Sequence, residues 1–234
     1  MSTSTSSVNV SIVGDGSAGK SSLIASLTSN GFSPHYKQTV GCDFYEKTIK
    51  LRDIQVTVRI WDIGGQSIHS QNFKNYIGNS DVVFLLYDVT SLESFDNLVD
   101  WNSNLKKHTS LSKVYVLGNK MDMYGQRQVS DEQHHDAIKS YKYKGGFLVS
   151  AKTGENILRA FYKAVSTYCN ITLSDSELSA VDSVITVSVN KSGEDEGRTS
   201  IADRIEEEDR LAALDYERRR QEELEGMEGC CRIM

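Results

Sequence analysis

Short apolar runs alternate with longer stretches of helical composition along the first 170 residues of this 234-residue chain. Their length and their content of branched and aromatic residues are typical of buried strands. The runs are Val8–Val13, Phe44–Leu51, Val56–Trp61, Val82–Tyr87, Val114–Leu117 and Phe147–Val149. We expect helices near residues 20–29, 92–108, 131–141 and 154–170. This alternation predicts an α/β domain with a mostly parallel sheet.

The second and third runs break the alternation, because only the tetrapeptide Arg52-Asp53-Ile54-Gln55 separates them. So short a link permits an antiparallel hairpin and excludes a right-handed crossover between parallel strands. We therefore expect a six-stranded, mostly parallel sheet with one antiparallel edge strand and helices on both faces. The expected domain covers residues 8–171 and follows a disordered N-terminus at residues 1–7.

The composition changes beyond Ile171, and residues 172–234 are interpreted as an acidic, partly helical tail. Residues 173–234 hold 8 basic and 17 acidic residues, so the tail carries a net charge of about −9 and the rest of the chain about +3. Residues 172–200 have no clear period and predict a linker, whereas residues 201–225 favour helix. A solvated arm is the simpler interpretation, and a docking helix for a partner is the alternative. Such acidity argues against binding to nucleic acid.

Cysteine content and hydropathy limit the cellular compartments in which the protein is expected. The four cysteines, Cys42, Cys169, Cys230 and Cys231, lack the spacing of a disulfide framework, which indicates a reducing compartment. The N-terminus lacks the basic and apolar regions of a secretory signal. The longest relevant apolar run, Val82–Tyr87, is far too short for a transmembrane helix.

A glycine-rich segment after the first run carries the strongest chemical signal. Residues 14–21, Gly-Asp-Gly-Ser-Ala-Gly-Lys-Ser, fit the phosphate-loop pattern G-x-x-x-x-G-K-[ST]. Between a strand and a helix, such a loop directs backbone N–H groups at an anion. Lys20 would supply charge to the outer phosphates, and the Ser21 hydroxyl would bind Mg²⁺. The expected phosphate-binding residues are Asp15, Gly16, Ser17, Ala18, Gly19, Lys20, Ser21 and Ser22.

Four further motifs follow the phosphate loop in the sequence. The first is Lys37-Gln38-Thr39-Val40-Gly41, on the link before the hairpin. The others are Trp61-Asp62-Ile63-Gly64-Gly65-Gln66, Gly118-Asn119-Lys120-Met121-Asp122 and Ser150-Ala151-Lys152, each at the end of a predicted strand. Because such strand ends line the ligand crevice of an open α/β sheet, we expect these motifs to share one site.

With these five motifs in order, residues 8–171 resemble the Ras superfamily of small GTPases and, within it, the Rab family. The resemblance implies the P-loop NTPase fold of a G domain. The likeness is greatest to the divergent Rab branch numbered twenty-eight, on the evidence of Lys37-Gln38-Thr39, Val40-Gly41-Cys42-Asp43-Phe44 and the Trp61–Gln66 segment. Most Rab proteins carry Thr-Ala where this chain has Ile63-Gly64.

The resemblance implies a Mg²⁺ site and a guanine site. Thr39 would join Ser21 as a ligand when the γ-phosphate is bound, and Asp62 would act through water. The Asp122 carboxylate would accept hydrogen bonds from guanine N1–H and N2–H₂, which adenine lacks, so the site would reject adenine. The remaining residues expected to bind GTP or GDP are Phe32, Tyr36, Asn119, Lys120, Ser150, Ala151 and Lys152.

Hydrolysis of GTP would depend on Gln66 and Gly65, together with Lys20. In Ras, the best-known member of the superfamily, the corresponding glutamine orients the attacking water, and an arginine from an activating protein raises a slow rate about 10⁵-fold. Residues 31–42 contain no arginine, so we expect slow intrinsic hydrolysis that depends on such a partner. Gly64-Gly65 predicts a more mobile loop in the GDP state. A GTP-bound scaffold with negligible hydrolysis is the alternative.

The C-terminal residues Cys231-Arg232-Ile233-Met234 fit the prenylation motif C-a-a-X, with farnesyl favoured by the terminal Met. With Cys230 the ending also resembles a doubly geranylgeranylated Rab terminus, and palmitoylation of Cys230 is a third option. The resemblance implies a monomer that moves between the cytosol and the cytosolic face of an intracellular, endosomal or ciliary membrane in vesicle traffic. Its implied partners are an exchange factor, a GTPase-activating protein, effectors and a prenyl-binding escort protein.

Two remaining groups of residues are interpreted as structural. His69, His134 and His135 show no metal-ligand spacing and are predicted to lie on the surface. Trp101 recurs with Leu98 and Leu105 at helical spacing, which predicts a core position for all three.

Overall fold

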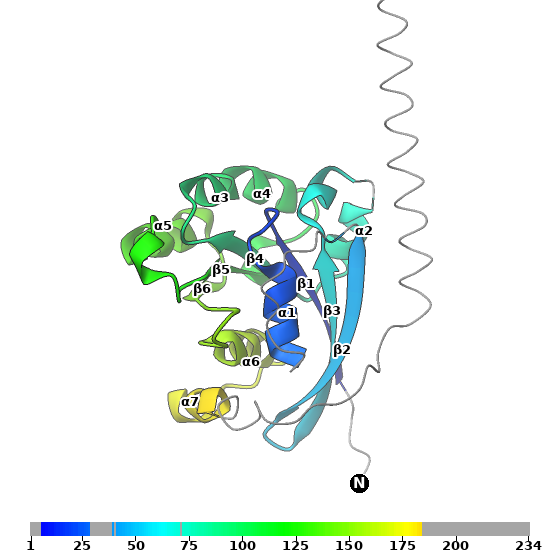
Figure 1. The fold of residues 1–234 in the computed structure, drawn as a ribbon. Helices are drawn as coiled ribbons and strands as arrows, with labels where there is room; N and C mark the ends of the chain where they lie inside the picture. The colour runs from blue at the N-terminus through cyan, green and yellow to red at the C-terminus, as the bar shows by residue number, and fades with distance from the viewer. Residues whose placement is uncertain (1–5, 29–38, 40, 71, 184–234) are drawn as a thin grey trace, which may run out of the picture.

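The computed structural model describes residues 6–28, 39, 41–70 and 72–183. Its centre is a single six-stranded sheet (Figure 1). The strands are β1 (Ser6–Gly14), β2 (Cys42–Leu51), β3 (Ile54–Ile63), β4 (Val82–Asp88), β5 (Val114–Asn119) and β6 (Gly145–Leu148). Their spatial order is β2-β3-β1-β4-β5-β6, with β2 antiparallel to β3 and all other pairs parallel. The predicted sheet, including its antiparallel edge strand, is confirmed.

Helices cover both faces of the sheet, as the sequence predicts. One core cluster joins the sheet to α1 (Lys20–Thr28), α6 (Ile157–Tyr168) and α7 (Asp175–Ser183). The other joins the opposite face to α2 (Phe73–Gly78), α4 (Leu98–Leu105) and α5 (Asp131–Tyr141). The short helix α3 (Leu92–Asp96) precedes α4 (Figure 1). Within the described ranges, no helix has both the length and the apolarity needed to cross a membrane.

The position of the central strand β4 between two layers of helices explains why its sequence is continuously apolar. Val83 and Leu85 belong to the core beneath α4, whereas Phe84 and Leu86 belong to the core beneath α6. All four are buried, with at most 1% of their surface exposed. A parallel strand covered on both faces needs apolar residues at every position rather than at every second one.

The predicted helix at 92–108 is divided between α3 and α4. The Ser91 side chain accepts a hydrogen bond from the Ser94 N–H and so caps α3. Leu98, Trp101 and Leu105 are buried on α4, which confirms their predicted place in the core. The six-residue helix α2 was not expected, because it is shorter than the window over which helical periodicity can be recognised.

Regular structure extends beyond the expected domain at both ends. Ser6 and Ser7, predicted to be disordered, pair with Val56 and Thr57 at the start of β1. Helix α7 occupies residues 175–183, where the composition predicts a linker. Leu173 and Leu178 explain the difference, because both side chains are buried in the core beside α6.

The hairpin between β2 and β3 also holds α7. The Arg52 guanidinium donates to the Thr172 carbonyl at 2.7 Å and to the Glu177 carboxylate at 3.1 Å. Both side chains of this ion pair are substantially exposed, so its contribution to stability is small beside that of the buried leucines. The two contacts fix the position of α7 beside the hairpin turn.

The prediction that His134 lies on the surface is wrong. Only 2% of its surface is exposed, and its Nδ1 lies 3.0 Å from the Tyr87 hydroxyl. Burial lowers the pKa of His134 to about 4, so the ring is neutral near pH 7. The neighbouring His135 is exposed, as predicted. The capping box at Ser130 fixes the start of α5. With this start, residue 134 lies on the face of the helix that packs against the sheet.

If α7 belongs to the fold, Leu178→Ala should lower the free energy of unfolding by about 2 kcal/mol, because a buried leucine is truncated. Urea denaturation of the full chain measures this change. Ser179→Ala, on the neighbouring exposed position of the same helix, is the control and should change stability by less than about 0.5 kcal/mol. Equal stabilities of the two variants would contradict the assignment of α7 to the folded domain.

Candidate functional site

The phosphate loop connects the end of β1 to the first turn of α1. Its backbone adopts left-handed conformations at Ser17, with φ of 64°, and at Gly19, with φ of 93°. A side chain at residue 19 would collide with the amide of Asn119, so the glycine also allows close packing. The loop therefore curves back over the start of α1, as an anion-binding loop must.

Lys20 lies inside this curve with only 6% of its surface exposed. Its Nζ donates hydrogen bonds to the carbonyl oxygens of Gly14 at 2.8 Å and Asp15 at 2.7 Å. Burial lowers the pKa of Lys20 to about 8, although the carboxylates of Asp62 and Asp15 act in the opposite direction. A buried ammonium of this kind is stabilised by an anionic ligand.

Three side-chain oxygens from separate segments meet beside Lys20. The Ser21 hydroxyl lies 2.9 Å from the Thr39 hydroxyl and donates to Asp62 Oδ2 at 2.5 Å. The Asp62 side chain is fully buried, and burial raises its pKa to about 6. Its other oxygen, Oδ1, lacks a hydrogen-bond partner among the described residues. A hard cation such as Mg²⁺ fits this donor set and would offset the cost of burying the carboxylate.

Asn119, at the end of β5, joins the phosphate loop to the segment after β6. Its side-chain Nδ2 donates to the Ala18 carbonyl at 2.8 Å, and its Oδ1 accepts from the Ala151 N–H at 2.9 Å. Asn119 is only 1% exposed, so both hydrogen bonds are shielded from water. Asn119 is predicted to bind the nucleotide, and the structure shows in addition that it bridges two loops.

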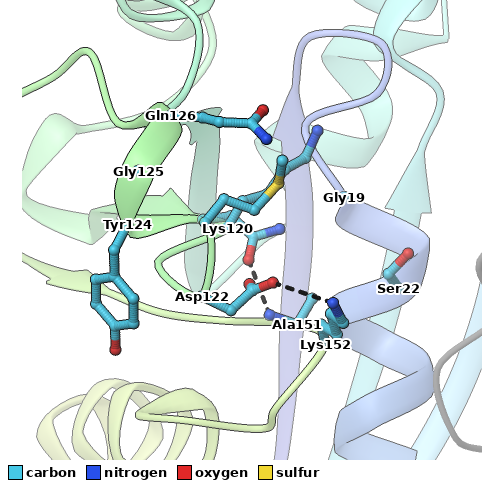
Figure 2. Close-up of a pocket in the computed structure, with 11 residues that line it drawn as sticks. Gly19, Ser22, Lys120, Asp122, Tyr124, Gly125, Gln126, Ala151 and Lys152 are labelled. Atoms are coloured by element: carbon cyan, nitrogen blue, oxygen red, sulfur yellow. Dashed lines mark hydrogen bonds and ion pairs between the residues drawn. The ribbon is translucent and has the colours of Figure 1, made fainter.

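The Asp122 carboxylate lies between two residues of the segment after β6. Its Oδ1 accepts a hydrogen bond from the Ser150 hydroxyl at 2.6 Å, and its Oδ2 lies 3.8 Å from Lys152 Nζ. Figure 2 shows the Lys152 side chain directed toward Asp122, whereas the Lys120 side chain extends away from it. Ser150 is fully buried and holds the carboxylate in place, while the ammonium of Lys152 remains largely exposed.

A cavity of about 660 Å³ opens beside these residues (Figure 2). It is lined by Gly19, Ser22, Asn119, Lys120, Asp122, Met123, Tyr124, Gly125, Gln126, Ala151 and Lys152. The cavity begins at the phosphate loop and reaches Asp122, so a nucleotide with its phosphates at Lys20 would place its base beside that carboxylate. The residues 123–126 were not predicted, and only their position directly after the Asn119–Asp122 motif could have indicated them.

Lys120 adopts a left-handed backbone conformation, with φ of 70°. Its Nζ forms an ion pair with Asp88 Oδ2 at 2.6 Å, and Asp88 is the last residue of the neighbouring strand β4. Non-glycine residues with such backbone strain are concentrated at functional sites. The role of Asp88 was missed, because no spacing in the sequence connects it to Lys120.

Two glycines just after the end of β3 allow close contacts, Gly65 with the phosphate loop and Gly64 with the segment that contains Thr39 and Gly41. A side chain at Gly65 would lie 2.5 Å from the Gly16 nitrogen, and one at Gly64 would lie 2.6 Å from the Thr39 carbonyl. Gly64 N–H also donates to the Gly41 carbonyl at 2.9 Å. Gly64 thus permits a close approach of two segments, a steric role that the prediction of greater mobility did not include. Gln66 is an exposed residue of the short 3₁₀ helix at Gly65–His69.

Most residues predicted for the site are close together in the structure. Thr39, Asp62 and Gly65 contact the phosphate loop or Ser21 directly after it, and Asn119 contacts the same loop through Ala18. Phe32 and Tyr36 lie outside the described residues, as do Cys230 and Cys231. A further pair was missed: Asn97 and Trp101 donate hydrogen bonds to the Asp15 carboxylate.

Comparison with known proteins gives consistent results along the chain. Residues 9–170 match the model of the Ras family. The chain is 39% identical to the Ras-related protein Rab-28 of Caenorhabditis elegans over 187 residues, which is 78% of this chain and 75% of that protein. It is 37% identical to the GTP-binding protein ypt2 of Schizosaccharomyces pombe over 66% of this chain and 78% of the relative. It is 32% identical to the Ras-related protein Rab-8B of Bos taurus over 77% of this chain and 89% of that protein.

The position of Asp122 leads to a test of base selection. Asp122→Asn replaces an acceptor by an amide donor, so affinity for GDP should fall at least about 100-fold as charge-assisted hydrogen bonds are lost. Affinity for xanthosine diphosphate should rise, because xanthine offers a carbonyl oxygen where guanine offers an amine. Isothermal titration with both nucleotides measures the ratio. Asp136→Asn on the exposed face of α5 is the control, and equal ratios in both variants would exclude Asp122 from base recognition.

Proposed function

Because the chain belongs to the Ras family and, within it, to the Rab GTPases of vesicle traffic, we propose that its cavity binds GTP and GDP at the residues described. The convergence of Ser21, Thr39 and Asp62 beside Lys20 carries this proposal. These groups supply a buried cation for the phosphates and hard oxygen ligands for Mg²⁺. Bound Mg²⁺ would neutralise part of the charge on the outer phosphates.

Two segments of the chain are positioned to distinguish GTP from GDP. Thr39 reaches Ser21 through its hydroxyl, and the Gly65 backbone lies against Gly16 of the phosphate loop. A γ-phosphate would hold Thr39 and Gly65 together at the site, and its loss would release both. Effectors would recognise the difference through residues 32–46 and 62–78.

Gln66 is the residue proposed to orient the attacking water. It follows Gly65, which lies against the phosphate loop, and its side chain is exposed to solvent. Lys20 would stabilise charge on the outer phosphate oxygens during the reaction. With no arginine in residues 31–42, we propose slow intrinsic hydrolysis and acceleration by an activating protein that supplies one.

A GTP-bound scaffold with negligible hydrolysis is the second candidate. Gly64 favours this function, because it allows the backbone at Thr39 to lie very close to residue 64. That contact would hold Gln66 away from the position needed to orient the attacking water. Single-turnover hydrolysis of bound GTP, with and without an activating protein, separates the two functions. Phosphate release in neither condition would overturn the proposed hydrolase and favour the scaffold.

The site of action proposed is the cytosolic face of an intracellular membrane. The membership in the Rab family supports this location, and Cys230 and Cys231, which lie just before the last three residues of the sequence, are proposed to carry the lipid anchor. Exchange between membrane and cytosol would require a prenyl-binding escort protein, and the switch would require an exchange factor. Endosomal and ciliary membranes are the proposed locations. Intact mass of the protein purified from its native cell would show one prenyl group, two, or none.

The role of Gln66 can be tested by substitution. Gln66→Leu should slow single-turnover hydrolysis at least about tenfold, because the attacking water is no longer oriented. Affinity for GTP should change little, since the side chain is directed to water rather than to the nucleotide. Gln55→Leu, at an exposed position of β3 near the hairpin turn, is the matched control. Equal hydrolysis rates in both variants would remove Gln66 from the mechanism.

A further inference from the structure

The carboxylate of Asp15, in the phosphate loop, is held by two donors from the helices on the opposite side of the loop from α1. Trp101 Nε1 donates to Asp15 Oδ1 at 2.7 Å, and Asn97 Nδ2 donates to Oδ2 at 2.8 Å. Asn97 lies at the junction of α3 and α4, and Trp101 follows it on α4. Both carboxylate oxygens are therefore engaged outside the nucleotide cavity.

The main chain of the same residue faces the phosphate site. The Asp15 carbonyl accepts a hydrogen bond from Lys20 Nζ at 2.7 Å. On its other side, the Gly65 Cα lies so close that an added Cβ would be 2.8 Å from the Asp15 carbonyl carbon. The Asp15 peptide group thus contacts both the buried ammonium of Lys20 and the backbone of Gly65, the residue before Gln66.

From these contacts we propose that Trp101 and Asn97 are positioning residues for nucleotide binding, and that they act by holding the Asp15 carboxylate. This inference rests on the proposed binding of guanine nucleotide at the same loop. The chain places a carboxylate in a loop that must bind polyphosphate, where a free negative charge would repel the ligand. Two neutral donors keep this charge directed toward α4 and set the position of the Asp15 carbonyl.

The surroundings of Trp101 suit it to this role. Only 2% of its surface is exposed, and its ring packs against Phe73, with ring centroids 6.1 Å apart. A side chain fixed in a packed core can hold a hydrogen-bond partner without a further loss of rotamer freedom. The core beneath α4 therefore contributes to the position of the phosphate loop through the indole nitrogen of Trp101, alongside the Asn97 amide.

GDP release tests the proposal. The full chain is loaded with a fluorescent GDP analogue, excited directly at the analogue, and chased with excess unlabelled GDP. Trp101→Phe and Asn97→Ala should each release the analogue about tenfold faster, as expected for losing one hydrogen bond to a charged group. Asn97 is only half-buried, so Asn97→Ala tests the proposal even if Trp101→Phe fails to fold. Asn104→Ala, which removes another amide from α4, is the control.

A double-mutant cycle separates positioning from packing. In an Asp15→Ala background, Trp101→Phe should produce no further acceleration, because the hydrogen-bonded partner is already absent. Phe73→Leu disturbs the packing around Trp101 without removing its indole N–H, and should change release less than twofold. Independent, multiplicative effects of Asp15→Ala and Trp101→Phe would overturn the proposal, as would wild-type release rates in Trp101→Phe and Asn97→Ala. Absence of guanine nucleotide binding in the wild-type chain would instead overturn the proposed function.

Discussion

The buried amide of Asn119 is the interaction on which the site depends. It bonds at once to Ala18 in the phosphate loop and to Ala151 after β6, two segments more than a hundred residues apart in the sequence. Since water is excluded there, loss of either partner would leave a buried polar group unsatisfied. The amide also rests against Gly19, whose missing side chain allows the contact. The phosphate and base ends of the cavity thus have a fixed separation before any ligand arrives.

The two buried charges create the complementary requirement for a ligand. Lys20 and Asp62 lie at the same edge of the sheet. Burial lowers the pKa of Lys20 and raises the pKa of Asp62, so it favours the neutral form of each side chain. Such groups reduce the stability of the protein alone, because their desolvation is only partly compensated. A bound anion and cation would each supply the missing compensation. The chain would then be markedly more stable with nucleotide and Mg²⁺ than without them, by the ordinary linkage of binding to folding.

The sequence predicted the sheet, its antiparallel edge and most residues of the candidate site, because continuous apolar runs and glycine-rich motifs are local signals. Asn119 and Asp122 were identified from one pentapeptide, whereas their contacts with Ala18 and Ser150 arise from tertiary structure. Helix α7 was missed because two buried leucines in a polar segment do not form a period. The hydrogen bonds from Asn97 and Trp101 to Asp15 were missed for a related reason. Trp101 has the pattern of a core residue, and a pattern of hydrophobicity contains no information about where an indole N–H points.

The central position of β1 has a consequence for the order in which the fold can form. Its partners β3 and β4 begin at residues 54 and 82, so the first strand synthesised acquires both neighbours only after β4 has been made. Contacts between such distant segments slow folding, because loop closure must precede the stabilising interactions. The cavity is completed later still, when residues 150–152 reach the phosphate loop. During synthesis, the chain would therefore bind a nucleotide only when the domain is nearly complete. The first binding of a nucleotide would coincide with completion of the sheet.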